Sequence, residues 1–222
     1  MQFNRRPLEL AGRISERMTN EIRVEPGLFR ASLDDAIRFG GDIVRDAIRA
    51  MNLRHDRRNV VIDVKVHMLM PGFFPAIPGW HTDGAPRSPD GSPSGKGPPD
   101  IMAQESGSFR PHRFHLLVTQ CQCLTEFVAE PISINVPAVP TTDLYKHVTR
   151  LVGEAHPATK FIPGNQVVEF DWWDLHRGVA ALKHEWRCLV RAVESDHYTP
   201  NRDLRDVLRN QQQVYVPMDF GW

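Results

Sequence analysis

The chain has 222 residues, of which 41% are hydrophobic and 24% charged, as in a folded globular protein and unlike a disordered one. Lys and Arg number 27 and so do Asp and Glu, which excludes a strong overall attraction to nucleic acid or anionic membranes. No signal-peptide core and no run of about eighteen apolar residues is present, and three cysteines make an odd number. We therefore expect one domain over residues 1–222, soluble and in the reducing cytoplasm.

The first third of the chain predicts a helix followed by a strand. Residues 32–51, "SLDDAIRFGGDIVRDAIRAM", begin with an N-cap serine and place apolar side chains at helical spacing. Gly40 and Gly41 weaken this amphipathic helix. Residues 59–72, "NVVIDVKVHMLMPG", alternate in polarity and are rich in valine, so they predict a strand that ends at a Pro-Gly turn.

Two chemically active side chains precede a long run of turn-forming residues. The segment "FFPAIPGWHTD" carries His81 and Asp83, and it is followed by "APRSPDGSPSGKGPPD", which is almost entirely Pro, Gly, Ser and Asp. Such a composition offers little apolar area to offset the entropy of ordering. We expect the loop of residues 85–108 to be mobile without substrate and to close over it as a lid.

The remainder of the chain predicts several strands and two helices. Residues 114–137 have strand character, residues 141–155 predict a helix, and residues 166–170 form a short strand after a Pro-Gly turn. Residues 185–195, "EWRCLVRAVES", give the clearest strand pattern, and residues 201–213 predict a last helix. These elements favour a mainly β fold, a sandwich or barrel with flanking α-helices.

His81, Asp83 and His176 are candidate metal ligands. In an extended segment residues i and i+2 point to one side, so His81 and Asp83 can reach a single point in space. His176, in "DLHRGVA", would complete a set of two imidazoles and one carboxylate, which leaves three positions open on an iron ion. The alternative is that each histidine is a hydrogen-bonded structural residue.

Two arginines share one face of the strand over residues 185–195. Arg187 and Arg191 lie four residues apart, and both faces of this strand are expected to be buried. A buried guanidinium requires an anion, and its planar fork suits a carboxylate. The alternative for Arg187 is a structural ion pair, for which the candidate partners are Glu185, Glu169 and Asp171.

The combined pattern resembles the Fe(II)/2-oxoglutarate-dependent dioxygenases, most closely the phytanoyl-CoA-dioxygenase-like branch. In that branch a Pro-Gly precedes a Trp-His-x-Asp motif, and a Pro-Gly-x-x-Val strand leads to the second histidine. Here the matching stretches are "PG" and "WHTD" within residues 59–84, then "IPGNQVVEFDWWDLHRGVAA" within residues 160–193. An arginine, Arg187, follows the second histidine by eleven residues.

The resemblance implies a double-stranded β-helix, which is the jelly-roll or cupin-like architecture. It further implies that His81, Asp83 and His176 hold Fe(II), and that Arg187 binds the distal carboxylate of the cosubstrate 2-oxoglutarate. Arg191 matches a second position, where related enzymes hold the cosubstrate or an anionic substrate. The expected reaction is hydroxylation of an organic substrate coupled to decarboxylation of 2-oxoglutarate.

The substrate and the oligomeric state are not predicted by the sequence. The loop after Asp83 is long and the chain is short compared with the family, so the family's substrate cannot be transferred. A small molecule is our first expectation. The second is a nucleobase in DNA or RNA, with Arg5, Arg6 and Arg13 near phosphates, although the balanced charge disfavours it. A third alternative is a non-enzymatic cupin-like barrel that binds a metal or a sugar.

Overall fold

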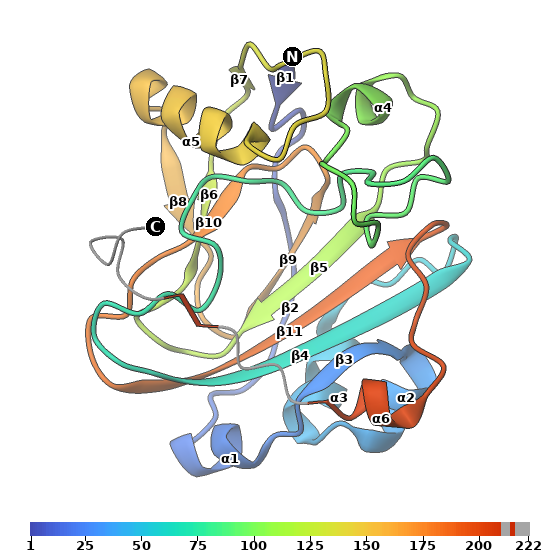
Figure 1. Ribbon diagram of the computed structural model, residues 1–222. Helices are drawn as coiled ribbons and strands as arrows, with labels where there is room; N and C mark the ends of the chain where they lie inside the picture. Colours follow the sequence, from blue (N-terminus) through green and yellow to red (C-terminus); the bar gives the residue numbers. More distant parts are fainter. Residues whose placement is uncertain (210–213, 216–222) are drawn as a thin grey trace.

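The computed structural model describes residues 1–209, 214 and 215, and its fold is mainly β with a few helices (Figure 1). The strands are β1 (Gln2–Phe3), β2 (Glu9–Arg13), β3 (Leu28–Ser32), β4 (Asn59–Leu69), β5 (Arg113–Val118), β6 (Thr125–Val128), β7 (Ile132–Ser133), β8 (Thr159–Phe161), β9 (Gln166–Asp171), β10 (His176–Gly178) and β11 (Glu185–Ser195). The helices are α1 (Thr19–Val24), α2 (Leu33–Phe39), α3 (Asp42–Ala50), α4 (Ile101–Glu105), α5 (Leu144–Ala155) and α6 (Leu204–Val207).

The described strands form three sheets in which all pairings are antiparallel. The largest has six strands in the order β2-β9-β5-β11-β4-β3, a smaller one has the order β10-β6-β8, and β1 pairs with β7. The long strands β4 and β11 pair along their whole length, from Asn59 with Ser195 to Leu69 with Glu185. This arrangement of antiparallel sheets is consistent with a β-sandwich.

Two apolar cores cover the two faces of the six-stranded sheet. One lies between this sheet, the three-stranded sheet and α5, and includes Phe114, Phe127 and Phe170. The other lies against α1, α2 and α3 and includes Ile43 and Val190 (Figure 1). Because side chains alternate along a strand, β11 contributes its odd-numbered residues to the first core and its even-numbered residues to the second.

Helical structure is found where it was predicted over residues 32–51, but it is not one continuous helix. The Oγ of Ser32 accepts a 3.1 Å hydrogen bond from the Asp35 amide, as expected of an N-cap. The single helix predicted over residues 32–51 is instead divided into α2 and α3 at Gly40 and Gly41, where the amide of Gly41 donates to the buried Glu25 side chain. A Cβ at Gly41 would lie 2.4 Å from that carboxylate, so glycine permits the close approach.

The other predicted elements are found with small differences. β4, β9 and β11 occupy the predicted strand segments, and the helix predicted over residues 141–155 is α5. Residues 114–137, for which strand character was predicted, contain most of β5 and all of β6 and β7, joined by turns. Of the last helix predicted over residues 201–213, α6 accounts for four residues, and residues 210–213 lie outside the described part. Within the described residues, no helix has the length and apolar content needed to cross a bilayer.

Candidate metal centre

His81 and His176 are held side by side by their own backbones. The amide of His81 donates to the His176 carbonyl at 3.1 Å, and the amide of His176 donates to the His81 carbonyl at 3.0 Å. Residues paired in this way project their side chains to the same face, and the two ring centroids are 4.5 Å apart. The first strand residue of β10 is thereby joined to the segment that follows Pro78.

The orientation of both imidazoles is fixed by backbone carbonyls. The Nδ1 of His81 lies 2.8 Å from the Gly79 carbonyl oxygen, and the Nδ1 of His176 lies 3.0 Å from that of Asp174. Since a carbonyl only accepts, each Nδ1 carries the proton and donates it, and each Nε2 keeps its lone pair. Metal-binding histidines commonly have this arrangement, in which a second hydrogen bond fixes the tautomer.

Helix α5 holds the segment that carries His81 and Asp83. The hydroxyl of Tyr145 donates to the Thr82 carbonyl at 2.9 Å, and the hydroxyl of Thr149 donates to the Trp80 carbonyl at 3.3 Å. These bonds satisfy backbone groups that have no strand partner in this stretch of turns. The predicted helix therefore positions the candidate ligands, a role that its apolar pattern did not indicate.

Asp83 brings the carboxylate to the two imidazoles. Its Oδ2 lies 3.7 Å from the Nε2 of His176, and ligand atoms of His81, Asp83 and His176 all lie within 4.8 Å of one another. Burial lowers the pKa of His176 to about 4, helped by the neighbouring His81, so this imidazole is neutral at pH 7. The three residues can hold a metal ion as two neutral imidazoles and one carboxylate, a 2-His-1-carboxylate set.

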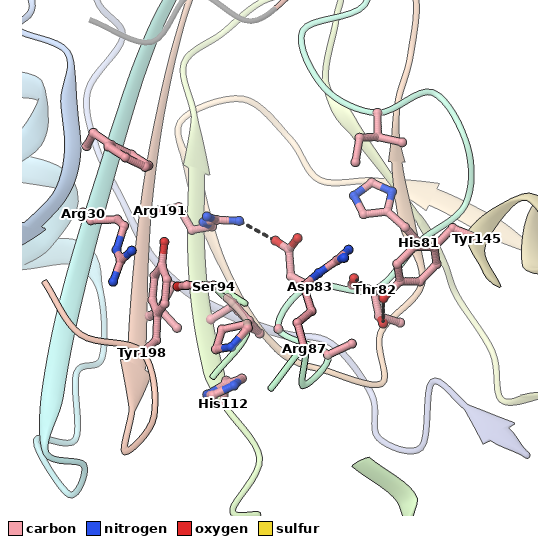
Figure 2. A pocket seen from close by; sticks show the side chains of 17 residues that line it. Arg30, His81, Thr82, Asp83, Arg87, Ser94, His112, Tyr145, Arg191 and Tyr198 are labelled. Atoms are coloured by element: carbon pink, nitrogen blue, oxygen red, sulfur yellow. Dashed lines mark hydrogen bonds and ion pairs between the residues drawn. The ribbon is translucent and has the colours of Figure 1, made fainter. Parts of the chain in front are cut away.

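Arg191 connects Asp83 to the six-stranded sheet. Its Nη1 donates to Asp83 Oδ2 at 2.6 Å (Figure 2). Its Nη2 donates to Asp63 Oδ2 at 2.7 Å. Burial alone would raise the pKa of Asp83, but Arg191 and the two histidines outweigh it and hold that pKa well below its usual range. Asp83 is therefore ionised, as a ligand must be, and Arg191 orients it from outside the ligand set.

Comparison with protein-family models, curated proteins and solved structures finds no match to this chain.

Two cavities meet at the candidate metal ligands. The larger, of about 410 Å³, has His81 and Asp83 in its wall together with Arg30, Arg87 and Arg191. The smaller, of about 180 Å³, is lined by all three candidate ligands and extends between the sheets. A volume of about 300–1,000 Å³ is usual for a small-molecule site, so the larger cavity suits a substrate.

Lys65 lines the smaller cavity and was not predicted as a functional residue. Burial lowers the pKa of its ammonium group, and the nearby Arg191 adds to this effect. The carboxylates of Asp63 and Asp83 oppose this lowering, but Lys65 forms no ion pair with either within the described part of the chain, so its ammonium group is available to an anion in the cavity. In "VVIDVKVH" the polar residues Asp63 and Lys65 are two apart in a valine-rich strand, and this alternation is the signal that could have found them.

Arg187 lies on the same face of β11 as Arg191, but it does not reach the candidate ligands directly. Its side chain is 1% exposed, and its Nε donates to the Cys123 carbonyl at 3.0 Å. Its Nη1 is buried without a hydrogen-bond partner in the described residues. No carboxylate proposed above as an alternative partner pairs with it there, since Glu185 accepts from the amides of Gln122 and Cys123.

His112 and His115 are both buried. His115 Nε2 lies 3.0 Å from Glu194 on the helix-covered face of the sheet, so it is structural. His112 lies in the wall of the larger cavity, and burial lowers its pKa to about 4. Two further cavity residues, Arg30 and Tyr198, come from segments with no sequence signal for a site.

Proposed function

We propose that this protein is a non-haem Fe(II) oxygenase that couples 2-oxoglutarate decarboxylation to hydroxylation of a small molecule. The observation that carries the proposal is the convergence of His81, Asp83 and His176 where two cavities meet. Two neutral imidazoles and a carboxylate are the ligand set of Fe(II) oxygenases, and they leave coordination positions for other ligands. The resemblance of the surrounding motifs to that family supports the same conclusion, and with it a double-stranded β-helix architecture.

The residues around the triad fit Fe(II) and 2-oxoglutarate in specific ways. The iron would be held by His81, Asp83 and His176, and when bound it supplies the activation of dioxygen that the side chains lack. The Gly79 and Asp174 carbonyls keep both imidazoles in the ligating tautomer. Arg191 keeps Asp83 ionised and aimed at the same point.

The smaller cavity is the proposed site of the cosubstrate. It borders all three ligands and carries the cation Lys65, and Arg187 follows farther along the same sheet face with an unpartnered Nη1. A dicarboxylate that begins at the metal would place its distal carboxylate toward this cationic end. Arg187 is the partner implied by the family resemblance, and Lys65 is a second candidate from the cavity itself.

The larger cavity is the proposed site of the substrate, and residues of the loop help to form it. Arg87, Pro93 and Ser94 all line this cavity, so movement of the loop over residues 85–108 would change access to it. Its volume of about 410 Å³ favours a small molecule over a nucleobase presented by a polynucleotide.

Anaerobic titration with Fe(II) and 2-oxoglutarate tests this function. We expect a weak visible absorption band from the iron chelate, and succinate and CO2 once air is admitted. Asp83→Ala should lose the band, whereas His184→Ala, which alters an exposed histidine, should keep it. Metal binding without any binding of 2-oxoglutarate would contradict the proposal and favour the non-enzymatic cupin-like barrel.

A further inference from the structure

Arg30 has a backbone conformation that only a specific local structure can stabilise. Its φ is 49°, in the left-handed region, and it lies where the register between β3 and β4 shifts between Leu28 and Ala31. Such a conformation is strained for a residue other than glycine and is often found at functional sites. β-Bulges also redirect a side chain out of the regular strand pattern.

The bulge is tied to the candidate metal ligands through Asp63. The amide of Arg30 donates to Asp63 Oδ1 at 2.9 Å, and Asp63 Oδ2 accepts from Arg191, which also donates to Asp83. A continuous set of hydrogen bonds therefore fixes Arg30 relative to Asp83. The strained backbone of Arg30 therefore belongs to the same hydrogen-bond network as the candidate ligand Asp83.

The Arg30 side chain lies against Tyr198 in the wall of the larger cavity. Its guanidinium carbon is 4.6 Å from the centre of the Tyr198 ring, and its Nε donates to the Thr199 carbonyl at 3.1 Å. Its Nη1 has no hydrogen-bond partner in the described residues. In Figure 2, Arg30 and Tyr198 lie on the side of the cavity opposite His81 and Tyr145.

A second arginine reaches the same cavity from the loop after the candidate ligands. Arg87 Nη1 donates to the Gly97 carbonyl at 2.9 Å, which holds the side chain against its own loop. Arg87 lines the same cavity as Asp83 and Arg191 (Figure 2). Arg30 and Arg87 therefore reach the cavity from different segments of the chain.

The charges of the cavity wall are unequal. Its described lining includes three arginines, Arg30, Arg87 and Arg191, and one carboxylate, Asp83. Arg191 is shared between Asp83 and Asp63, and a divalent metal at the triad would more than neutralise Asp83. Arg30 and Arg87 form no ion pair in the described residues, so their charges are available to a ligand.

We propose that the larger cavity selects a substrate with a carboxylate or phosphate group, bound between Arg30 and Arg87. The wall also carries apolar side chains, Phe29, Ile77, Phe114 and Val193, so the body of the substrate includes a hydrocarbon or aromatic part. Polar side chains share the wall, namely Thr82, Ser94, His112, Tyr145 and Tyr198. Arginine suits both kinds of anion because its fork donates two parallel hydrogen bonds. This inference rests on the proposed function in taking the bound anion as the molecule that is oxidised.

Binding of three matched aromatic probes tests the inference. Benzoate, phenyl phosphate and the neutral benzyl alcohol are titrated by calorimetry into the protein loaded with Mn(II) and saturating 2-oxoglutarate, without oxygen. We expect one or both anions to bind and benzyl alcohol not to bind. Preference for benzoate indicates a carboxylate substrate, and preference for phenyl phosphate indicates a phosphate ester.

Substitution of each arginine distinguishes binding of the anion in this cavity from direct coordination of the anion to the metal. Arg30→Met and Arg87→Met should each lower the affinity for the preferred anion by about tenfold or more. Arg49→Met, on the exposed face of α3, should leave this affinity unchanged. Arg30→Lys and Arg87→Lys should recover part of the loss. Circular dichroism checks the fold of each variant, and because the two arginines lie on different segments, either one alone can decide the test.

The possible failures are distinguishable. If 2-oxoglutarate binds but neither anion does, or if both Met variants bind anions like the wild type, the substrate inference is overturned and the oxygenase proposal stands. If the Mn(II) protein binds anions through Arg30 and Arg87 but never binds 2-oxoglutarate, the anion site stands without the proposed reaction.

Discussion

Arg191 donates a 2.6 Å hydrogen bond to the carboxylate of Asp83, from which it is separated by 108 residues along the chain. The same guanidinium holds Asp63, so one cation on β11 serves two acids, one from β4 and one from the candidate metal centre. Removing only one partner of such a pair is destabilising, because the remaining charge is left unpaired in a desolvated position. The organisation of the site can therefore be tested by stability as well as by ligand binding.

Arg191→Met should lower the free energy of unfolding of the metal-free protein by about 3–5 kcal/mol, because it leaves Asp63 and Asp83 without their shared cation. Urea unfolding followed by circular dichroism measures this change. Combining it with Asp63→Asn should cost less than the sum of the two single changes, since the double variant removes a buried charge as well as its partner. Strict additivity of the two substitutions would show that the pair is not coupled.

Each of His81→Ala, Asp83→Ala and His176→Ala should weaken metal binding by more than the roughly 10–100-fold loss typical of a residue outside the ligand set. The physical reason is that each change removes a coordinating atom. Calorimetric titration with Mn(II) or, anaerobically, with Fe(II) measures the affinity. His184→Ala is the matched control, and a metal site elsewhere would be indicated if the three variants bound like the wild type.

Arg187→Met should weaken the binding of 2-oxoglutarate by about 30-fold or more and leave the affinity for Fe(II) nearly unchanged, since the distal carboxylate of 2-oxoglutarate would lose the buried guanidinium that pairs with it. Lys65→Met provides the comparison, because Lys65 lines the smaller cavity directly. Calorimetry with Mn(II) in place of iron compares the two variants. A loss in Lys65→Met alone would assign the distal carboxylate to Lys65 instead of Arg187.

Residues 92–97 should exchange their amide hydrogens quickly in the metal-loaded protein and more slowly after substrate binds, as expected of a closing loop. The amides of Gln104 and Ser106 should exchange slowly in both states. They are hydrogen-bonded in α4, and the Gln104 side chain donates to the buried Trp172 carbonyl at 2.7 Å. Hydrogen exchange with mass spectrometry distinguishes residues 92–97 from α4. Uniform strong protection of both without substrate would argue against a lid.

Glu194 should make the stability of the fold depend on pH. Burial alone would raise its pKa, but hydrogen bonds from His115 and Arg113 outweigh this and lower the pKa to about 2. A folded pKa below the unfolded value near 4.5 stabilises by about 3 kcal/mol above pH 4.5, and this stability is lost as the pH falls toward 2. Glu194→Gln should therefore be less stable than the wild type at pH 6, with a smaller difference at pH 3. An equal difference at both pH values, measured by urea unfolding, would contradict the linkage.

The local sequence predicted the long strands and α5 because their side-chain periodicity is strong and continuous. The valine-rich alternation of β4 and the pattern of β11 leave little choice of secondary structure, and both strands lie where predicted. At the division of the helix, the amide of Gly41 donates to Glu25, which lies sixteen residues earlier at the end of α1. A contact of that kind has no local periodicity, so the pattern alone overestimated the length of the helix.

The candidate ligands were predictable, whereas their supporting residues were not. His81, Asp83 and His176 were chosen because metal chemistry restricts the residue types, and their ligand atoms do come together. The sequence placed more weight on Arg187, but the guanidinium that contacts Asp83 belongs to Arg191. Strand alternation places both arginines on one face, and it does not specify which lies opposite a loop that begins about a hundred residues earlier.

The backbone bridge between His81 and His176 means that the candidate metal centre closes a large loop of the chain. The bridge joins segments that are 95 residues apart, and closing so long a loop carries an entropic cost that its two hydrogen bonds must offset. A metal held by both imidazoles would add a third link between these segments, beside the two backbone hydrogen bonds. Metal binding would then raise the unfolding temperature, and its removal would loosen first the junction between β10 and the segment before the loop.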